Sequence, residues 1–153
     1  MNSILIIVYS TSGKTEEMGN FIAEGVRFTG NIAIVKRISE ISDFVDIKKY
    51  DGYIIGSPTI SLDIPRPVRA FLNTLKTVEL GNKLAGAFGP YLHDASYRHD
   101  EHAPVLIFAF LEKELKLKPF SLGALSLKEE AINSREGIKA CQEYGRNFSK
   151  ELI

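Results

Sequence analysis

Short apolar runs alternate with longer segments of helical spacing along the whole chain. Each apolar run ends in or next to Gly, Ser, Thr or Pro, as strands do where they enter a loop. The first run, Ile4-Leu5-Ile6-Ile7-Val8, is continuous, which is typical of a strand that is covered on both faces in a parallel sheet. The predicted strands cover residues 4–9, 32–35, 52–55, 84–88 and 120–127. This alternation predicts an α/β protein.

Helical spacing fills the segments between these strands. The expected helices cover residues 15–29, 65–75, 104–117 and 138–152, and a less regular one lies within residues 41–50. Residues 105–111 are apolar throughout and also allow a strand, but the leading Pro104 and the length of the segment favour a helix. Strands that alternate with helices predict right-handed crossovers and a doubly wound sheet, with ligands outside the carboxyl ends of the strands. We therefore expect the chemistry in the loops after the first, third and fourth strands.

Length and composition indicate one domain and give no sign of a nucleic acid or membrane partner. The length of 153 residues fits one domain, so we expect residues 1–153 to form a single domain. The 19 basic and 19 acidic residues cancel, which gives no electrostatic reason to expect a nucleic acid or an anionic membrane as partner. The first residues lack a basic region, and the apolar run that follows is too short for a signal peptide or a membrane span. We expect a cytoplasmic location.

Cys141 is the only cysteine, so the chain has no internal disulfide and no multi-cysteine metal or iron–sulfur site. It falls on a helical stripe with Ile138, Gly145, Phe148 and Leu152. We interpret it as an inert packing residue.

The strongest chemical signal follows the first strand. Residues 10–15, here called the phosphate loop, are Ser10, Thr11, Ser12, Gly13, Lys14 and Thr15. Hydroxyl groups and a glycine at the amino end of a helix form a concave set of donors that suits a phosphate. A plain helix cap needs only one hydroxyl, whereas several converge here. A nucleotide-triphosphate loop would need a glycine at position 8, which is Val8, so that reading is disfavoured.

At this point the sequence resembles the flavodoxin family. Residues 8–18, VYSTSGKTEEM, are similar to the flavodoxin phosphate loop, and residues 54–60, IIGSPTI, with PRPVRAFL at 65–72, are similar to its third strand, flavin loop and next helix. AGAFGPY at residues 85–91 looks like the fourth strand and second flavin loop, and CQEYGR at 141–146 resembles the last helix. The similar stretches are spread over nearly the whole chain and follow one another in the same order as in flavodoxins. It points to the short-chain type and to the flavodoxin-like domain of flavodiiron proteins.

The resemblance implies a five-stranded parallel sheet of order 2-1-3-4-5 that holds FMN at its carboxyl edge. It implies a low-potential electron carrier that acts between redox partner proteins. The residues that we expect to bind the cofactor are Ser10, Thr11, Ser12, Gly13, Lys14, Thr15, Ser57, Pro58, Thr59, Ile60, Phe88, Gly89, Tyr91 and Tyr97. Tyr91 is our candidate for stacking on the flavin ring, with Tyr97 as its rival.

The sequence departs from the family pattern at three places. Residues 60–64 contain no glycine, where flavodoxins often have one beside the flavin, and Lys14 stands where the family usually has an uncharged residue. Lys14 could contact the phosphate or extend into water. His93, His99 and His102 lie in a long loop with carboxylates; they could bind a metal, or His93 could donate a proton, but a solvated loop is the favoured interpretation.

Two other functions stay open at this stage. The first is an FMN-dependent oxidoreductase of the same fold, of the NAD(P)H:quinone reductase or protoporphyrinogen oxidase type. The second is a scaffold domain that has lost its flavin, because a fold does not determine a function. The nearly intact phosphate loop argues against the scaffold.

Overall fold

A computed structural model describes residues 1–60, 63–92 and 102–152, and a parallel sheet runs through its centre. The strands β1 (Ser3–Val8), β2 (Ile32–Arg37), β3 (Gly52–Gly56) and β4 (Leu84–Tyr91) take the order β2-β1-β3-β4. The short strands β5 (Lys118–Pro119) and β6 (Leu125–Lys128) both pair with β4 and share the fifth position. The predicted order 2-1-3-4-5 is confirmed.

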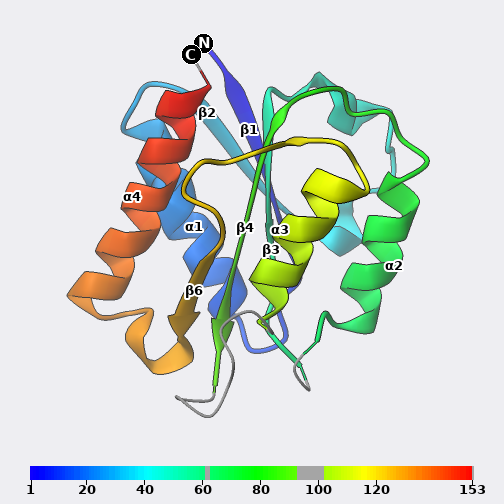
Figure 1. Cartoon of the computed structure of the whole chain (residues 1–153). Helices are drawn as coiled ribbons and strands as arrows, with labels where there is room; N and C mark the ends of the chain where they lie inside the picture. The colour runs from blue at the N-terminus through cyan, green and yellow to red at the C-terminus, as the bar shows by residue number, and fades with distance from the viewer. Residues whose placement is uncertain (61–62, 93–101, 153) are drawn as a thin grey trace.

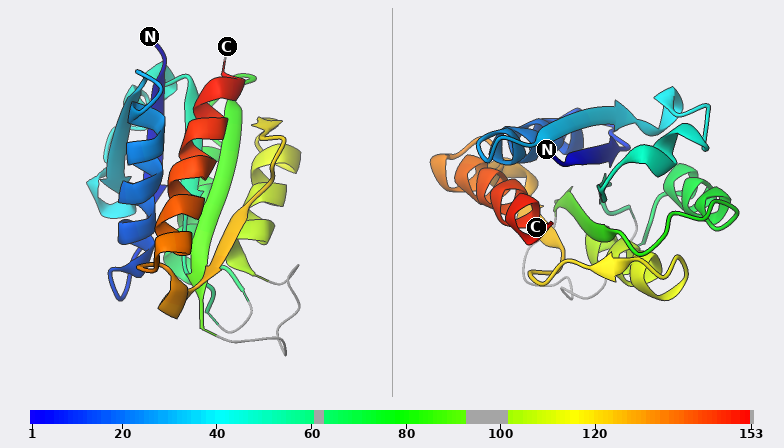
Figure 2. Two further views of the ribbon diagram at one scale, coloured as in Figure 1. Left: turned by 90° about the vertical axis from the view of Figure 1, so that its left-hand side faces the viewer. Right: turned by 90° about the horizontal axis from the view of Figure 1, so that it is seen from above.

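Helices cover both faces of the sheet (Figure 1). Helices α1 (Lys14–Arg27) and α4 (Arg135–Glu151) lie on one face, and α2 (Arg66–Leu75) and α3 (Ala103–Lys113) lie on the other. The view from above in Figure 2 shows the sheet between these two layers. Both termini lie at the end of the molecule opposite the carboxyl edge of the sheet (Figure 1).

The continuous apolar run of β1 is explained by this double cover. Ile4, Ile6 and Val8 pack with residues of α1 and α4, whereas Leu5 and Ile7 pack with residues of α2 and α3. All five side chains are almost fully buried. Because successive side chains of a strand point to opposite faces, a strand covered on both faces needs an apolar residue at every position.

The apolar segment after Pro104 is a helix, as its length indicated. Pro104 lies in the first turn of α3, where a missing N–H removes no helical hydrogen bond. Ile107 and Leu111 are buried against the sheet, four residues apart on one helical face. Cys141 is buried in α4 and has no disulfide partner, in agreement with its interpretation as a packing residue. No helix in the described part of the chain has both the length and the apolar character that a membrane span requires.

Two predicted elements are wrong in detail. In place of an α-helix within residues 41–50 the chain forms short 3-10 turns at Ile38–Glu40 and Asp46–Lys49. The Asp43 carboxylate accepts a hydrogen bond from the Val45 N–H at 2.9 Å, a local bond that competes with helix formation. Of the residues in Asp46–Lys49 only Ile47 is buried, so packing does little to favour a longer helix.

The predicted fifth strand, residues 120–127, is interrupted. Gly123 has a positive φ of 75° and its N–H donates to the Phe120 carbonyl, so the chain turns between β5 and β6. The Phe120 N–H still donates to the Ala85 carbonyl of β4 at 2.9 Å, and its ring packs edge-on against Tyr144 and Phe148 of α4. The Tyr144 hydroxyl then donates to the Gly123 carbonyl at 2.6 Å and holds the turn in place.

Close contact between α1 and α4 depends on glycine. A Cβ on Gly25 would lie 1.9 Å from the Gln142 carbonyl oxygen in α4, so Gly25→Ala forces the two helices apart. We expect this change to lower the free energy of unfolding by about 2–4 kcal/mol in urea titrations. Asn20→Ala, at an exposed position of α1, is the control and should stay within about 0.5 kcal/mol of the wild type. Equal stability of the two variants would contradict the close-packing argument.

Candidate functional site at the carboxyl edge

The phosphate loop turns sharply from β1 into α1. Gly13 has a φ of 90°, a conformation that other residues resist, and its N–H donates to the Ser10 hydroxyl at 3.0 Å. Open space surrounds the position where a Cβ on Gly13 would lie, and Thr11 and Ser12 are exposed. Thr15 is buried in the first helical turn. Within the described residues no side chain caps the amino end of α1, so its first N–H groups are available to an anion.

The loop after β3 is joined to the end of β4 by backbone contacts. The Ser57 N–H donates to the Phe88 carbonyl at 3.0 Å, and Gly89 packs so closely that a Cβ there would lie 1.8 Å from the Ser57 carbonyl oxygen. Ser57 and Phe88 are both fully buried. The Phe88 ring packs over Gly56 in the core, so only its backbone lies close to the sheet edge. Phe88 is therefore a support for the site, and its ring is not a surface for a ligand.

The loop after β3 is also tied to the other helical layer. The Thr59 hydroxyl accepts a hydrogen bond from the Ala103 N–H at 2.8 Å, at the first residue of α3. Ile60 pairs with Asp63 through two backbone hydrogen bonds, and its side chain is 45% exposed. An exposed isoleucine beside a backbone held in place offers an apolar surface at the sheet edge.

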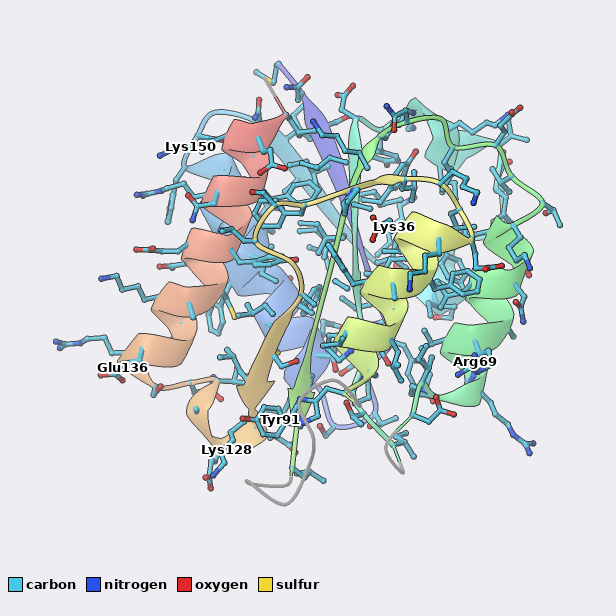
Figure 3. All side chains as sticks on the ribbon, in the orientation of Figure 1. Lys36, Arg69, Tyr91, Lys128, Glu136 and Lys150 are labelled. Carbon is cyan, nitrogen blue, oxygen red and sulfur yellow. The ribbon has the colours of Figure 1, made fainter. Side chains whose placement is uncertain are left out.

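Tyr91 is the last residue of β4 and is half-buried. Its ring stacks on the ring of His102 with a centroid distance of 4.3 Å and an interplanar angle of 29°. His102 is buried at the start of α3. Because β4 pairs with β6 up to Tyr91 and Lys128, these two residues lie together at the edge of the sheet (Figure 3).

The corner between β6 and α4 also contacts the phosphate loop, which was not expected from the sequence. The Ser12 hydroxyl donates to the Glu129 carboxylate at 3.2 Å, and the Lys14 ammonium donates to the Asn133 side chain at 2.9 Å. Lys14 also forms an ion pair with Glu17 at 3.3 Å. The Lys14 ammonium group therefore does not extend freely into water but is held by the side chains of Asn133 and Glu17. The sequence signal for this corner is its position after the fifth strand, whose carboxyl end lies at the same edge.

Charges around the phosphate loop are mostly paired. Arg37 donates to both oxygens of the Glu16 carboxylate, at 2.6 and 3.1 Å. The hydrogen bond from Arg37 is the main cause that lowers the pKa of Glu16 below its usual value. Glu16 therefore stays ionised at neutral pH, with its charge compensated by Arg37.

The structure brings together most of the residues that were predicted to bind a cofactor. The described ones lie in the loops after β1 and β3, in the first turn of α1 and in the last residues of β4, namely Ser10, Thr11, Ser12, Gly13, Lys14, Thr15, Ser57, Pro58, Thr59, Ile60, Phe88, Gly89 and Tyr91. Tyr97, His93 and His99 lie outside the described residues. Among the residues that are described, no three His, Cys, Asp or Glu side chains form a group that could hold a metal ion.

The fold and this edge define a flavodoxin-like protein. The structure superimposes on a flavodoxin from the domain Archaea with a TM-score of 0.82, 21% identity and 98% coverage of both chains. Flavodoxin 1 from Bacillus cereus gives a TM-score of 0.76 at 25% identity, with 99% of both chains covered. No protein-family model matches the sequence.

Sequence relatives point in the same direction. The flavo-diiron protein FprA2 of Clostridium acetobutylicum is 31% identical over 154 aligned residues, which cover 97% of this chain and 36% of FprA2. The chain therefore spans about a third of the length of that relative. An NAD(P)H dehydrogenase (quinone) of Azorhizobium caulinodans is 28% identical over 118 residues, 65% of this chain and 59% of the relative. The predicted resemblance to flavodoxins and to flavodiiron proteins is confirmed.

The contact between Thr59 and α3 can be tested by removing the hydroxyl. Thr59→Val keeps the shape of the side chain but leaves the Ala103 N–H without its acceptor, so we expect a loss of about 1 kcal/mol in the free energy of unfolding. Thr59→Ser keeps the hydroxyl and should recover most of that loss. Urea titration measures both variants, and a Thr59→Val protein as stable as the wild type would contradict the assignment.

Proposed function

We propose that residues 1–153 form one FMN-binding domain that carries electrons between redox proteins. The observation that carries the proposal is the phosphate loop, with four hydroxyl residues and a Gly13 turn at the uncapped amino end of α1. Such a site suits a phosphate monoester, because N–H and hydroxyl donors converge where the helix dipole is positive. Bound FMN would supply the chemistry that no side chain has, the reversible uptake of one or two electrons.

The residues present fit the two ends of this cofactor. We assign the phosphate to Ser10, Ser12 and Thr15 together with the first N–H groups of α1. Thr15 is almost fully buried, so we place it at the base of this site. We assign the flavin ring to the exposed Ile60 and to Tyr91, whose ring is already supported on one face by His102. Aromatic and apolar surfaces with nearby backbone donors are the usual surroundings of such a ring.

An electron carrier is favoured over a substrate-specific enzyme by the likeness to flavodoxins, which runs along 99% of this chain and 99% of flavodoxin 1 from Bacillus cereus. The likeness to the quinone dehydrogenase covers 65% of the chain. The second similarity still makes an FMN-dependent quinone reductase the alternative function. The two functions are separated by an assay of NAD(P)H oxidation with a quinone, which a carrier alone does not catalyse.

The partners that we propose are redox proteins that dock on the carboxyl edge. Ile60 is 45% exposed and Leu92 is 73% exposed, and both lie in loops of this edge. The formal net charge of zero provides little long-range steering, so we expect these apolar contacts to matter more than overall charge. A cytoplasmic location stays a prediction from the sequence.

The phosphate end of the site is tested by titration with FMN. We expect the wild type to quench flavin fluorescence on binding, and Thr15→Ala to lose about 1–3 kcal/mol of binding free energy with one hydrogen bond to a charged group. Thr15→Ser keeps the hydroxyl and should bind almost as well as the wild type. A wild type that binds no FMN overturns the proposed function. An unchanged dissociation constant in Thr15→Ala overturns the assignment of the loop.

The ring end is tested at Tyr91. Tyr91→Ala removes the proposed stacking surface, and we expect it to weaken FMN binding by about 1–3 kcal/mol and to restore part of the flavin fluorescence. Tyr91→Phe keeps the ring and should behave like the wild type. Titrations that show wild-type affinity and quenching in Tyr91→Ala would remove Tyr91 from the site.

A further inference from the structure

Glu129 is a carboxylate beside the phosphate loop, and the described part of the chain provides no ion-pair partner for it. Four carboxylates lie around the loop, and three of them form ion pairs: Glu16 with Arg37, Glu17 with Lys14 and Glu130 with Lys128. Among the described residues, no lysine or arginine lies within ion-pair distance of Glu129. Its contact is instead the Ser12 hydroxyl, which donates to it at 3.2 Å.

The position of Glu129 is determined by a packed corner of the fold. Glu129 begins the 3-10 turn Glu129–Ala131 directly after β6, and Ile132 behind it is fully buried. A Cβ on Gly137 would lie 1.9 Å from the Ala131 carbonyl oxygen, so α4 packs tightly against this turn. The Ser134 hydroxyl donates to the same carbonyl at 2.6 Å. The carboxylate is therefore held next to the loop by the backbone of the corner.

A serine hydroxyl has one hydrogen to donate. When Ser12 donates to Glu129, it cannot donate to a phosphate. A phosphate that takes this hydrogen must lie close to the negative charge of Glu129, which no lysine or arginine of the described residues pairs with. Lys14 lies in the same region but is engaged by Asn133 and Glu17. Water reaches this region, because a hollow of about 400 Å³ is lined by Lys14, Leu92, Lys128, Glu129, Glu130 and Asn133.

We propose that Glu129 sets the affinity of the phosphate loop by competing with the phosphate group of the flavin for the Ser12 hydroxyl. The inference rests on the proposed FMN site and adds a residue to it. The carboxylate acts against the phosphate group alone, since it contacts the phosphate loop through Ser12. The consequence is a cofactor that exchanges more readily than the hydroxyl groups of the loop would otherwise allow.

The test compares a flavin that carries a phosphate with one that does not. Fluorescence titrations with FMN and with riboflavin are made on the wild type, Glu129→Gln and Glu130→Gln. Glu130 is the neighbouring glutamate, highly exposed and paired with Lys128, so it is the matched control. Glutamine keeps an oxygen that can accept from Ser12, but as a neutral acceptor it holds the hydrogen less strongly than a carboxylate and does not repel the phosphate. We therefore expect Glu129→Gln to lower the FMN dissociation constant about five- to tenfold and to leave riboflavin unchanged. Glu130→Gln should change neither ligand.

The double variant Ser12→Ala/Glu129→Gln tests whether Glu129 acts through Ser12. The gain from Glu129→Gln should be smaller in the Ser12→Ala protein than in the wild type, because the contested hydrogen is absent. The difference between wild type and Glu129→Gln should also shrink as salt rises, since salt screens charge repulsion at a surface site.

The outcomes separate the inference from the proposed function. An FMN affinity that is unchanged or weaker in Glu129→Gln, while the wild type binds FMN, overturns the inference alone. Equal tightening of FMN and riboflavin also overturns it, because the effect would then not involve the phosphate. A wild type and variants that bind neither flavin overturn the proposed function and this inference together.

Discussion

Hydrogen bonds that continue the parallel ladder beyond the strand ends hold the whole carboxyl edge together. The Tyr9 N–H donates to the Gly56 carbonyl at 3.0 Å, and the Ser57 N–H donates to the Phe88 carbonyl at 3.0 Å. These bonds align the ends of β1 and β3 with Phe88 of β4, and β4 continues beyond that level to Tyr91. The Phe88 ring fills the space above Gly56 and leaves no room for a side chain there. This alignment keeps the distance between the phosphate loop, which follows β1, and Tyr91, which ends β4, the same from molecule to molecule.

The phosphate loop presents neutral donors, because the nearby cations are already paired. Lys14 is held by Asn133 and Glu17, and Arg37 neutralises Glu16. In the proposed FMN site the phosphate would therefore be bound by hydroxyl groups and helix N–H groups, which act only over short distances. The proposed influence of Glu129 follows from this, since these neutral donors would not offset its charge.

Much of the architecture was accessible from local pattern. Strand positions followed from apolar runs, and the phosphate loop followed from hydroxyl residues at a strand-to-helix junction. The predicted elements are wrong where tertiary packing, and not the local sequence pattern, determines the backbone. Phe120 has the β propensity of a strand residue and its N–H still bonds to β4, but its ring packs against Tyr144 and Phe148 and the chain turns directly after it at Gly123. Residues 41–50 have helical spacing but form only short 3-10 turns with little buried surface.

Sequence alone was therefore sufficient for the order of most elements, for the fold class and for the strand-to-helix turn at residues 10–15, because each depends on neighbours within a few residues. It could not place the contacts that join distant segments. Ser12 and Glu129 are separated by 117 positions, Lys14 and Asn133 by 119, and Thr59 and Ala103 by 44. Nothing in a local pattern says which side chain meets the loop from across the sheet. These contacts form only when the parallel strands bring their carboxyl ends to one edge of the sheet. The contacts of Ser12 and Lys14 determine which charges would surround a bound phosphate.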